Sequence, residues 1–411
     1  MSLKDYKQIF QQWGLSDNPF DFTPPDEIEQ VAATFHGRSQ ELESTLPALY
    51  EGRNVLIRGA WGIGKTALIK TLLYRLQQEV AELQEDMLVL YLGGIPKATA
   101  ADFYRAVLLA ITQQMSGQSE DAKKVADSLT GMSIQASKTK KEGGVNLGVF
   151  SIKLTSEPNS SDIRENEIYQ QLLFWLNEAE EIYSKVVIAV DDLDKRDTPI
   201  VQEIIENSLD LFRQGKKRAF IMTGRGFTDL QEATLFSLGV FSEDINLSRM
   251  SNDDLRQIVI NYLNTVRSEP SDSIAPFTPE VLARIIEYAQ GTPRQLNCIC
   301  EKVLRQAAMQ KHTAIDLSAW QNIWPKIQAS IMQELSPRLR QLLYVAYSQE
   351  GLSEDISNAT LDRLNARTYT SILPELQQLE SMDLIMRVED ERGFRYVPSK
   401  LYLPPTDPAD D

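Results

Sequence analysis

The feature that most restricts the fold is a glycine-rich octapeptide, Gly59–Thr66, with the sequence GAWGIGKT. It fits the pattern G-x-x-x-x-G-K-[ST], and it stands between a short β-rich run over 54–58 and a helical pattern over 66–75. A chain that passes from a strand through such glycines into a helix directs backbone N–H groups and a helix N-terminus at one point, which attracts phosphate. The octapeptide therefore predicts a phosphate-binding loop in an α/β domain.

Two side chains at the end of this loop have specific chemistry. The Lys65 ammonium can reach the β- and γ-phosphates of a nucleotide, so it is a candidate for both binding and catalysis, and the Thr66 hydroxyl can ligate Mg²⁺. The residues expected to contact the nucleotide are Gly59, Ala60, Trp61, Gly62, Ile63, Gly64, Lys65, Thr66 and Ala67.

A nucleotide site also needs an acidic element on another strand. The apolar run Val186–Val190 ends in Asp191 and Asp192. We expect Asp191 to hold the metal, directly or through water, while Asp192 either polarises the attacking water as a general base or supports the metal shell. The alternative is a structural role, in which these carboxylates only cap the start of the next helix.

The hydrophobic pattern indicates the fold class. Short apolar runs alternate with long helical periodicities, which is typical of a parallel sheet covered by helices on both faces. We therefore predict an α/β fold with the parallel sheet of P-loop NTPases. The strand runs are 54–58, 87–92, 186–190, 219–223 and 244–247, and the helical patterns are 40–50, 66–75, 101–115, 166–183 and 198–212.

The rest of the chain divides by pattern. Turn residues over 14–20 and Pro24-Pro25 favour an extended arm over a helix, and after Leu247 the strands give way to helices. Near Ser336-Pro337 a unit of three helices and a hairpin begins, the outline of a winged helix. The expected parts are an arm over 1–35, a sheet domain over 36–250, a helical lid over 251–335, a winged helix over 336–404 and a disordered tail over 405–411.

An insertion interrupts the sheet domain over 116–160. It is polar, it carries Lys138, Lys140 and Lys141, and apolar residues alternate after Gly143-Gly144. This pattern predicts a loop followed by a β-hairpin. Two interpretations stay open, a solvated surface excursion and a finger that contacts a partner or DNA.

Taken with the phosphate loop and the paired aspartates, further strings make the chain resemble the AAA+/STAND group of P-loop ATPases. The similarity is strongest to the branch of origin-recognition initiators and transposition or secretion helper ATPases, and it spans roughly residues 35–400. The strings are FHGRSQEL at 35–42, which is similar to the F-x-G-R-x-x-E-L motif ahead of the nucleotide fold, FIMTGR at 220–225 and GTPRQL at 291–296.

The resemblance implies ATP and Mg²⁺ as cofactors and three further catalytic candidates. Thr223 ends a sensor-1 segment and could hydrogen-bond the attacking water or the γ-phosphate. Arg225 and Arg294 occupy positions where such proteins place γ-phosphate sensors, and a guanidinium pairs well with phosphate oxygens; a structural ion pair is the alternative for each. The stretch around Phe20 could pack over adenine or serve as scaffolding.

Two departures from the AAA+ pattern affect the expected activity. AAA+ enzymes usually have Glu where Asp192 stands, and the shorter side chain predicts slow hydrolysis. Residues 226–248 contain no Lys or Arg, so the usual intersubunit arginine is missing unless Arg213 or an insertion residue replaces it.

Composition excludes several other classes of protein. The net charge of −16 disfavours strong non-specific nucleic-acid binding. The only cysteines and histidines are Cys298, Cys300, His36 and His312, which give no zinc pattern, and we expect the cysteines to be packing residues. With no secretory-type start and no membrane-length apolar run, we expect a cytoplasmic protein without a membrane partner.

The winged-helix segment has weak electrostatics for DNA. Residues 336–404 hold eight Lys or Arg against ten Asp or Glu, and Glu375 and Glu380 lie on the expected recognition helix. Both DNA contact and a protein-contact or autoinhibitory role stay open.

Three functions remain. The leading one is a slow ATPase that acts as a nucleotide-controlled, STAND-like switch for a separate effector protein chain, in which Arg294 closes the lid on ATP. The alternative is an initiator-like or transposition-helper ATPase that assembles on DNA, with a nucleotide-dependent homo-oligomer. The third is a nucleotide-stabilised scaffold with negligible turnover.

Overall fold

The computed structural model describes residues 3–20, 27–93, 99–129, 132–142, 145–154, 165–193, 198–213, 217–224, 239–382, 384–390 and 393–399, with backbone alone for 132–142, 145–154, 198–202 and a few single positions. The chain forms two compact units. The sheet unit is Pro24–Ser248, and the helical unit combines Met1–Thr23 with Arg249–Asp411. The expected tail over 405–411 lies outside the described residues.

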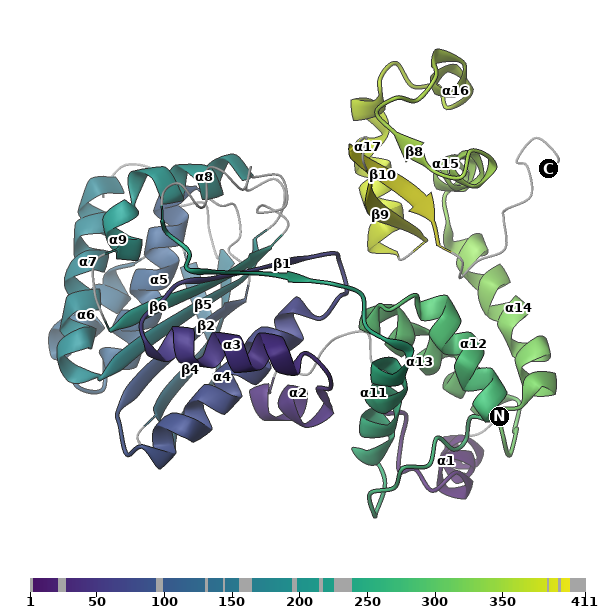
Figure 1. The fold of residues 1–411 in the computed structure, drawn as a ribbon, viewed down its shortest axis with the longest axis horizontal. Coiled ribbons are helices and arrows are strands. Elements are labelled where there is room, and N and C mark those ends of the chain that lie inside the picture. The colour runs from purple at the N-terminus through teal and green to yellow at the C-terminus, as the bar shows by residue number, and fades with distance from the viewer. Residues whose placement is uncertain are drawn as a thin grey trace. The chain divides into compact units, whose positions relative to one another are not determined.

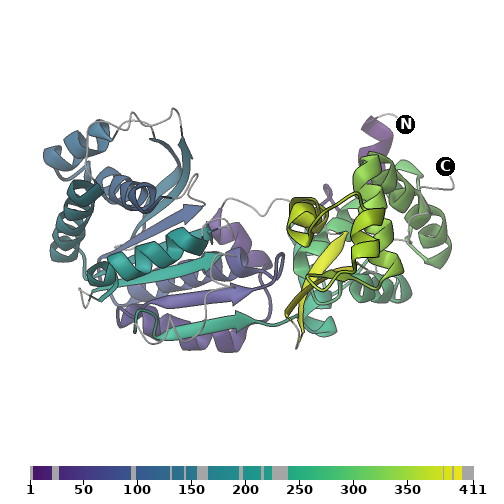
Figure 2. The ribbon, with the colours of Figure 1, turned by 90° about the horizontal axis from the view of Figure 1, so that it is seen from above.

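The sheet unit contains a seven-stranded sheet in the order β3-β4-β2-β5-β6-β1-β7. All neighbouring pairs are parallel except β3 with β4, and the five expected strands form its continuous part (Figures 1 and 2). The predicted α/β class with a parallel sheet is therefore confirmed. The strands are β1 (Val55–Gly59), β2 (Met87–Gly93), β3 (Met132–Glu142), β4 (Val145–Leu154), β5 (Lys185–Leu193), β6 (Arg218–Gly224) and β7 (Glu243–Leu247).

Helices cover both faces of this sheet because successive strand residues point to opposite sides. On one face, Ile57, Val89 and Ala189 pack in a core with helices α2, α3 and α4. On the other, Leu56, Leu90 and Ile188 pack with the remaining helices (Figure 1). The helices are α2 (Ile28–Thr34), α3 (Ser39–Tyr50), α4 (Lys65–Glu82), α5 (Ala100–Met115), α6 (Glu120–Ser128), α7 (Glu165–Ile182), α8 (Thr198–Asn207) and α9 (Leu209–Arg213).

The 116–160 segment differs in part from the expected loop and hairpin. Its first part contains helix α6, which is capped by Ser119 and was expected to be loop. The β3–β4 hairpin is present, and β4 pairs in parallel with β2, so the hairpin extends the central sheet instead of standing apart from it. The side chains of the three lysines in β3 lie outside the described part, so the finger interpretation is not tested.

The helical unit is built on α11 (Asn252–Asn264), α12 (Pro279–Ala289), α13 (Pro293–Met309) and α14 (Leu317–Glu334). Helix α1 (Leu3–Gln12) packs on α13, where Phe10 is buried and the Trp13 indole N–H donates to the Thr313 carbonyl at 3.0 Å. The expectation of an extended arm is therefore wrong for α1 and α2. The turn residues that suggested it lie after α1, and the amphipathic residues before them gain stability by covering the helical unit.

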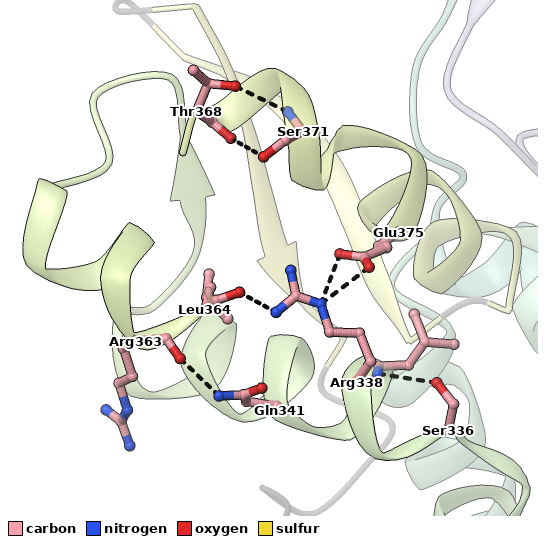
Figure 3. A network of polar contacts seen from close by, with 9 residues as sticks. Ser336, Arg338, Gln341, Arg363, Leu364, Thr368, Ser371 and Glu375 are labelled. Atoms are coloured by element: carbon pink, nitrogen blue, oxygen red, sulfur yellow. Dashed lines mark hydrogen bonds and ion pairs between the residues drawn. The ribbon is translucent and has the colours of Figure 1, made fainter. Parts of the chain in front are cut away.

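The C-terminal module of this unit has three helices and a small antiparallel sheet in the order β8-β10-β9. Arg338 joins its parts, because the guanidinium pairs with Glu375 on α17 at 3.0 Å and donates to the Leu364 carbonyl beyond α16 (Figure 3). The elements are α15 (Pro337–Ser348), β8 (Leu352–Ser353), α16 (Asn358–Arg363), α17 (Tyr369–Ser381), β9 (Ile385–Asp390) and β10 (Gly393–Pro398). Whether this module works as a winged helix remains a proposal.

Candidate functional site

Sheet topology brings three of the expected elements to one edge. β6 lies between β1 and β5, with Ile57 opposite Thr223 and Val190 opposite Met222. Because the carboxyl ends of parallel strands meet at the same edge, the glycine loop after β1, Thr223 near the end of β6 and Asp191 near the end of β5 are neighbours there. Residues 187, 189, 219 and 221 belong to the core under α4, so by alternation Asp191 and Thr223 lie on the face that α4 covers.

The glycines of the loop have backbone conformations that other residues rarely adopt. Gly62 has φ 73° and Gly64 has φ 101°, and Gly64 caps the N-terminus of α4. Gly59 is needed for a close approach, because a Cβ there would lie 3.1 Å from both Ile63 Cγ2 and Leu247 Cβ. At Gly64 a Cβ would meet no atom within 4 Å, so the space beside the helix N-terminus is open.

The Lys65 ammonium folds back over the loop. Its Nζ donates to the carbonyl oxygens of Gly59 at 2.9 Å and Ala60 at 3.0 Å. A positive charge is thus held beside the open N-terminus of α4, where phosphate oxygens could replace these carbonyls. Thr66, the second residue of α4, is half-buried beside it.

Asp191 is held by two hydrogen bonds in a buried position, with 3% of its surface exposed. Its Oδ1 accepts from the Asp192 backbone N–H at 2.8 Å, and its Oδ2 accepts from the Tyr91 hydroxyl, also at 2.8 Å. Sequence reasoning missed Tyr91. The signal was one hydroxyl in the otherwise apolar strand β2, MLVLYLG, but the partner depends on strand order.

Asp192 stands at an irregular point of the strand pair. Between the paired positions Val190–Met222 and Leu193–Gly224, β5 has one residue more than β6, which makes a bulge. Asp192 has φ 61° and is exposed, whereas its neighbour Asp191 is buried. The bulge therefore directs the two carboxylates differently, and such a conformation is frequent at functional sites.

Thr223 has the polar feature that most clearly indicates a ligand. Its side chain is 0% exposed, and among the described residues its hydroxyl has no hydrogen-bond partner. A buried hydroxyl without a partner is costly, so its presence here favours a role toward a bound group. The oxygen donors of Thr66 and Asp191 are the kind that Mg²⁺ takes in proteins, and the residues present therefore fit a magnesium–nucleotide ligand.

Neither Arg294 nor Arg225 belongs to the described part of the sheet unit. Arg294 is the second residue of α13 in the helical unit, after Gly291, whose φ of 76° and contact with Arg249 leave no room for a Cβ. Arg225 and the Arg213 side chain lie outside the described residues. Their roles remain proposals.

Other sequence features have structural partners. Phe20 is buried in the helical unit and stacks on Tyr262 with ring centroids 5.5 Å apart, which supports the scaffolding alternative. Arg38 donates to the Ser248 carbonyl at the end of the sheet unit and pairs with Glu41 at 3.3 Å. Cys298 and Cys300 are buried in α13 and form no disulfide. Among the described helices, none is long and apolar enough to cross a bilayer.

Comparison with known proteins agrees with this fold. Residues 42–222 match the model of the KAP family P-loop domain. No curated protein matches the sequence. The chain thus contains a P-loop NTPase domain, which implies nucleotide binding.

A solved structure with a similar fold is known. The Aeropyrum pernix ORC1 protein in complex with DNA has a TM-score of 0.52 at 13% identity, over 92% of this chain and 93% of that chain. This similarity concerns the fold alone. A Walker-type ATPase of Pyrococcus abyssi (TM-score 0.49, 14% identity, 93% and 98% covered) and the Thermotoga maritima RuvB branch migration motor (0.47, 15%, 92% and 97%) are more distant in structure.

Proposed function

We propose that this protein is an ATP-binding, Mg²⁺-dependent P-loop ATPase that works as a nucleotide-controlled switch for a separate partner protein. The observation that carries the proposal is the common sheet edge. There the Lys65 ammonium lies on the loop, and a fixed Asp191 carboxylate lies near the end of β5. The Thr223 hydroxyl, which has no hydrogen-bond partner among the described residues, lies on the intervening strand β6.

Each residue has a distinct task in this proposal. Lys65 exchanges its carbonyl partners for the β- and γ-phosphate oxygens and neutralises their charge. Thr66 and Asp191 would hold Mg²⁺, which would supply positive charge opposite the phosphates. Asp192 takes up or orients the proton of the attacking water, and Thr223 orients that water or the γ-phosphate. The exposed, short side chain of Asp192 is consistent with slow turnover, as expected for a switch.

Lys65→Ala tests the nucleotide site directly. Charge-assisted hydrogen bonds contribute about 1.5–3 kcal/mol each, so ATP affinity should fall at least about tenfold and hydrolysis should be lost. Lys217→Ala is the matched control, because that exposed ammonium also donates to a backbone carbonyl, Glu180 O at 2.5 Å, away from the loop. Equal ATP affinity of the Lys65 variant and the wild type would contradict the proposed function. Binding without measurable turnover, even with partner and DNA, would favour the scaffold.

The switch requires nucleotide-dependent partner binding. Copurification with ADP and with a non-hydrolysable ATP analogue should recover different partners or amounts, and Arg294→Ala should abolish the difference if that arginine closes the helical lid on ATP. The same recovery under both nucleotides would contradict a switch. Size-exclusion chromatography in the two nucleotide states tests the proposed homo-oligomer.

Assembly on DNA through the C-terminal module is the second candidate. The count of charges in the sequence disfavours this candidate, but the surroundings of two of the acidic residues favour it. Glu375 is paired with Arg338 inside the module, and Glu380 is only 7% exposed, so neither carboxylate faces a ligand freely. Thr370, Ser371 and Gln378 are exposed on α17, and Arg363 and Arg367 are exposed just before it.

A gel shift with duplex DNA tests this second candidate. ATP-dependent, salt-sensitive binding that falls on Arg367→Ala would support it, and no shift at low salt would dismiss it. The comparison with the DNA-bound Aeropyrum pernix ORC1 makes duplex DNA a sensible probe. Cytoplasmic location remains an expectation.

A further inference from the structure

Tyr91 lies beside the candidate metal carboxylate without being part of the phosphate loop. Its hydroxyl donates to Asp191 Oδ2 at 2.8 Å, and both residues are buried. Buried hydrogen bonds to a carboxylate are strong and directional, since little water competes for them. We infer that Tyr91 is a positioning residue, which aims the Asp191 carboxylate at Mg²⁺ in the nucleotide complex. This inference rests on the proposed function.

The strand register explains how the phenol reaches this carboxylate. In the pairing of β2 with β5, Gly93 lies opposite Asp191 and Tyr91 lies opposite Ala189. The Tyr91 ring must therefore lean along β2 toward Gly93 to reach the Asp191 carboxylate. Gly93 makes room for it, because a Cβ at Gly93 would lie 3.3 Å from Tyr91 Cε1. A larger residue at 93 would press on the ring.

Lys70 connects the same phenol to the helix of the phosphate loop. Lys70 is on α4, five residues after Lys65, and is only 5% exposed. Its Nζ lies 5.6 Å from the centroid of the Tyr91 ring, within the range of a cation–π contact. Tyr91 is thus in contact with both α4 and β5, the two elements that carry the proposed metal ligands Thr66 and Asp191.

The two hydrogen bonds also determine how many further hydrogen bonds or metal contacts the Asp191 carboxylate can accept. A carboxylate has about four lone-pair sites. The Tyr91 hydroxyl takes one on Oδ2 and the Asp192 N–H takes one on Oδ1, which leaves each oxygen able to accept once more. The carboxylate is therefore fixed in orientation while it keeps acceptor capacity for Mg²⁺ or a metal-bound water. Groups of this kind behind metal ligands change metal affinity by about 10–100-fold when they are removed.

Tyr91→Phe tests the inference because it removes only the hydroxyl. A fluorescent ATP analogue is titrated in EDTA and then with increasing Mg²⁺. We expect unchanged affinity in EDTA and about a tenfold higher Mg²⁺ concentration at half-saturation. In the Asp191→Asn background the same substitution should have little further effect, because Tyr91 acts through Asp191.

Tyr50→Phe is a closely matched control. The Tyr50 hydroxyl donates to Glu85 at 2.8 Å and Lys185 Nζ lies 4.9 Å from its ring, but Lys185 begins β5, at the opposite edge of the sheet. This variant should keep the wild-type Mg²⁺ dependence. An unchanged Mg²⁺ requirement in Tyr91→Phe, or an equal loss in Tyr50→Phe, would overturn the inference. Absence of nucleotide binding by the wild type would instead contradict the proposed function itself.

Discussion

Gly224 packs directly on the backbone of Leu193, so that a Cβ at Gly224 would lie 2.0 Å from the Leu193 carbonyl oxygen. This contact closes the bulge in which Asp191 and Asp192 oppose Thr223. The close approach of two strands therefore fixes the position of the three polar residues that form one side of the candidate site.

Gly224→Ala should consequently destabilise the sheet unit. The added methyl group has only backbone to displace, and overpacking of this kind costs about 1–3 kcal/mol or more. Urea unfolding followed by circular dichroism measures the loss. Gly117→Ala serves as the control, because a Cβ there would meet no atom within 4 Å. Equal stability of the two variants would show that the strands can separate at the bulge without cost.

Thr223→Val should lower ATP hydrolysis without lowering the stability of the fold. The hydroxyl is buried without a partner among the described residues, so its replacement by a methyl group should leave the free energy of unfolding unchanged or raise it by about 1 kcal/mol. ATP hydrolysis should fall about tenfold or more if the hydroxyl orients the water or the γ-phosphate.

Thr112→Val is the matched control for that substitution. Thr112 is also 0% exposed, but its hydroxyl donates to the Leu108 carbonyl at 2.8 Å on the other side of the sheet. Its loss should not affect hydrolysis. A Thr223 variant with normal turnover would assign the threonine a purely structural part.

Asp192→Asn should slow turnover while ATP stays bound. Asn tolerates the left-handed conformation that Asp192 adopts at φ 61°, so the fold should be kept, with a change in stability of about 0.5 kcal/mol or less. The amide cannot accept a proton as the carboxylate does, and single-turnover assays should show at least a tenfold lower rate. An unchanged rate would remove Asp192 from catalysis.

Arg338→Ala should weaken the C-terminal module. The guanidinium bonds both Glu375 and the Leu364 carbonyl, and its removal leaves these half-buried acceptors without a donor (Figure 3). We expect a loss of about 1–2 kcal/mol in thermal or chemical unfolding. Lys124→Ala, which breaks the exposed pair with Asp121, should cost about 0.5 kcal/mol or less. Equal losses of stability in the two variants would mean that the Arg338 contacts between helices do not stabilise the module.

The cysteines should resist thiol reagents in the folded protein. Burial raises the pKa of the Cys300 thiol, so the reactive thiolate is scarce at pH 8. Because the folded pKa exceeds the unfolded value of about 8.5, this group favours the folded state below that pH, and its contribution falls as the pH rises further. Both thiols should react with DTNB only after denaturation. Rapid reaction in native buffer would show that α13 opens locally.

The local features of this protein could be predicted because their causes lie close together in the chain. The strand–glycine–helix order of 55–66 and the apolar run before Asp191 depend on neighbouring residues, and the structure has them as expected. The prediction of an extended arm over residues 1–35 was wrong because the helix there depends on contacts with residues far away in the sequence. Residues 3–12 form a helix that buries Phe10 on the helical unit, and that surface is made by residues about three hundred positions later.

What the sequence by itself determined was the class of fold, the phosphate loop and the paired carboxylates. Only the tertiary structure decided that Tyr91 bonds Asp191, that a bulge turns Asp192 outward while Asp191 stays buried, and that Glu375 is neutralised by Arg338. These facts depend on which strands become neighbours and in what register. Such pairings are set by burial summed over the whole sheet, and no short stretch of sequence contains that information.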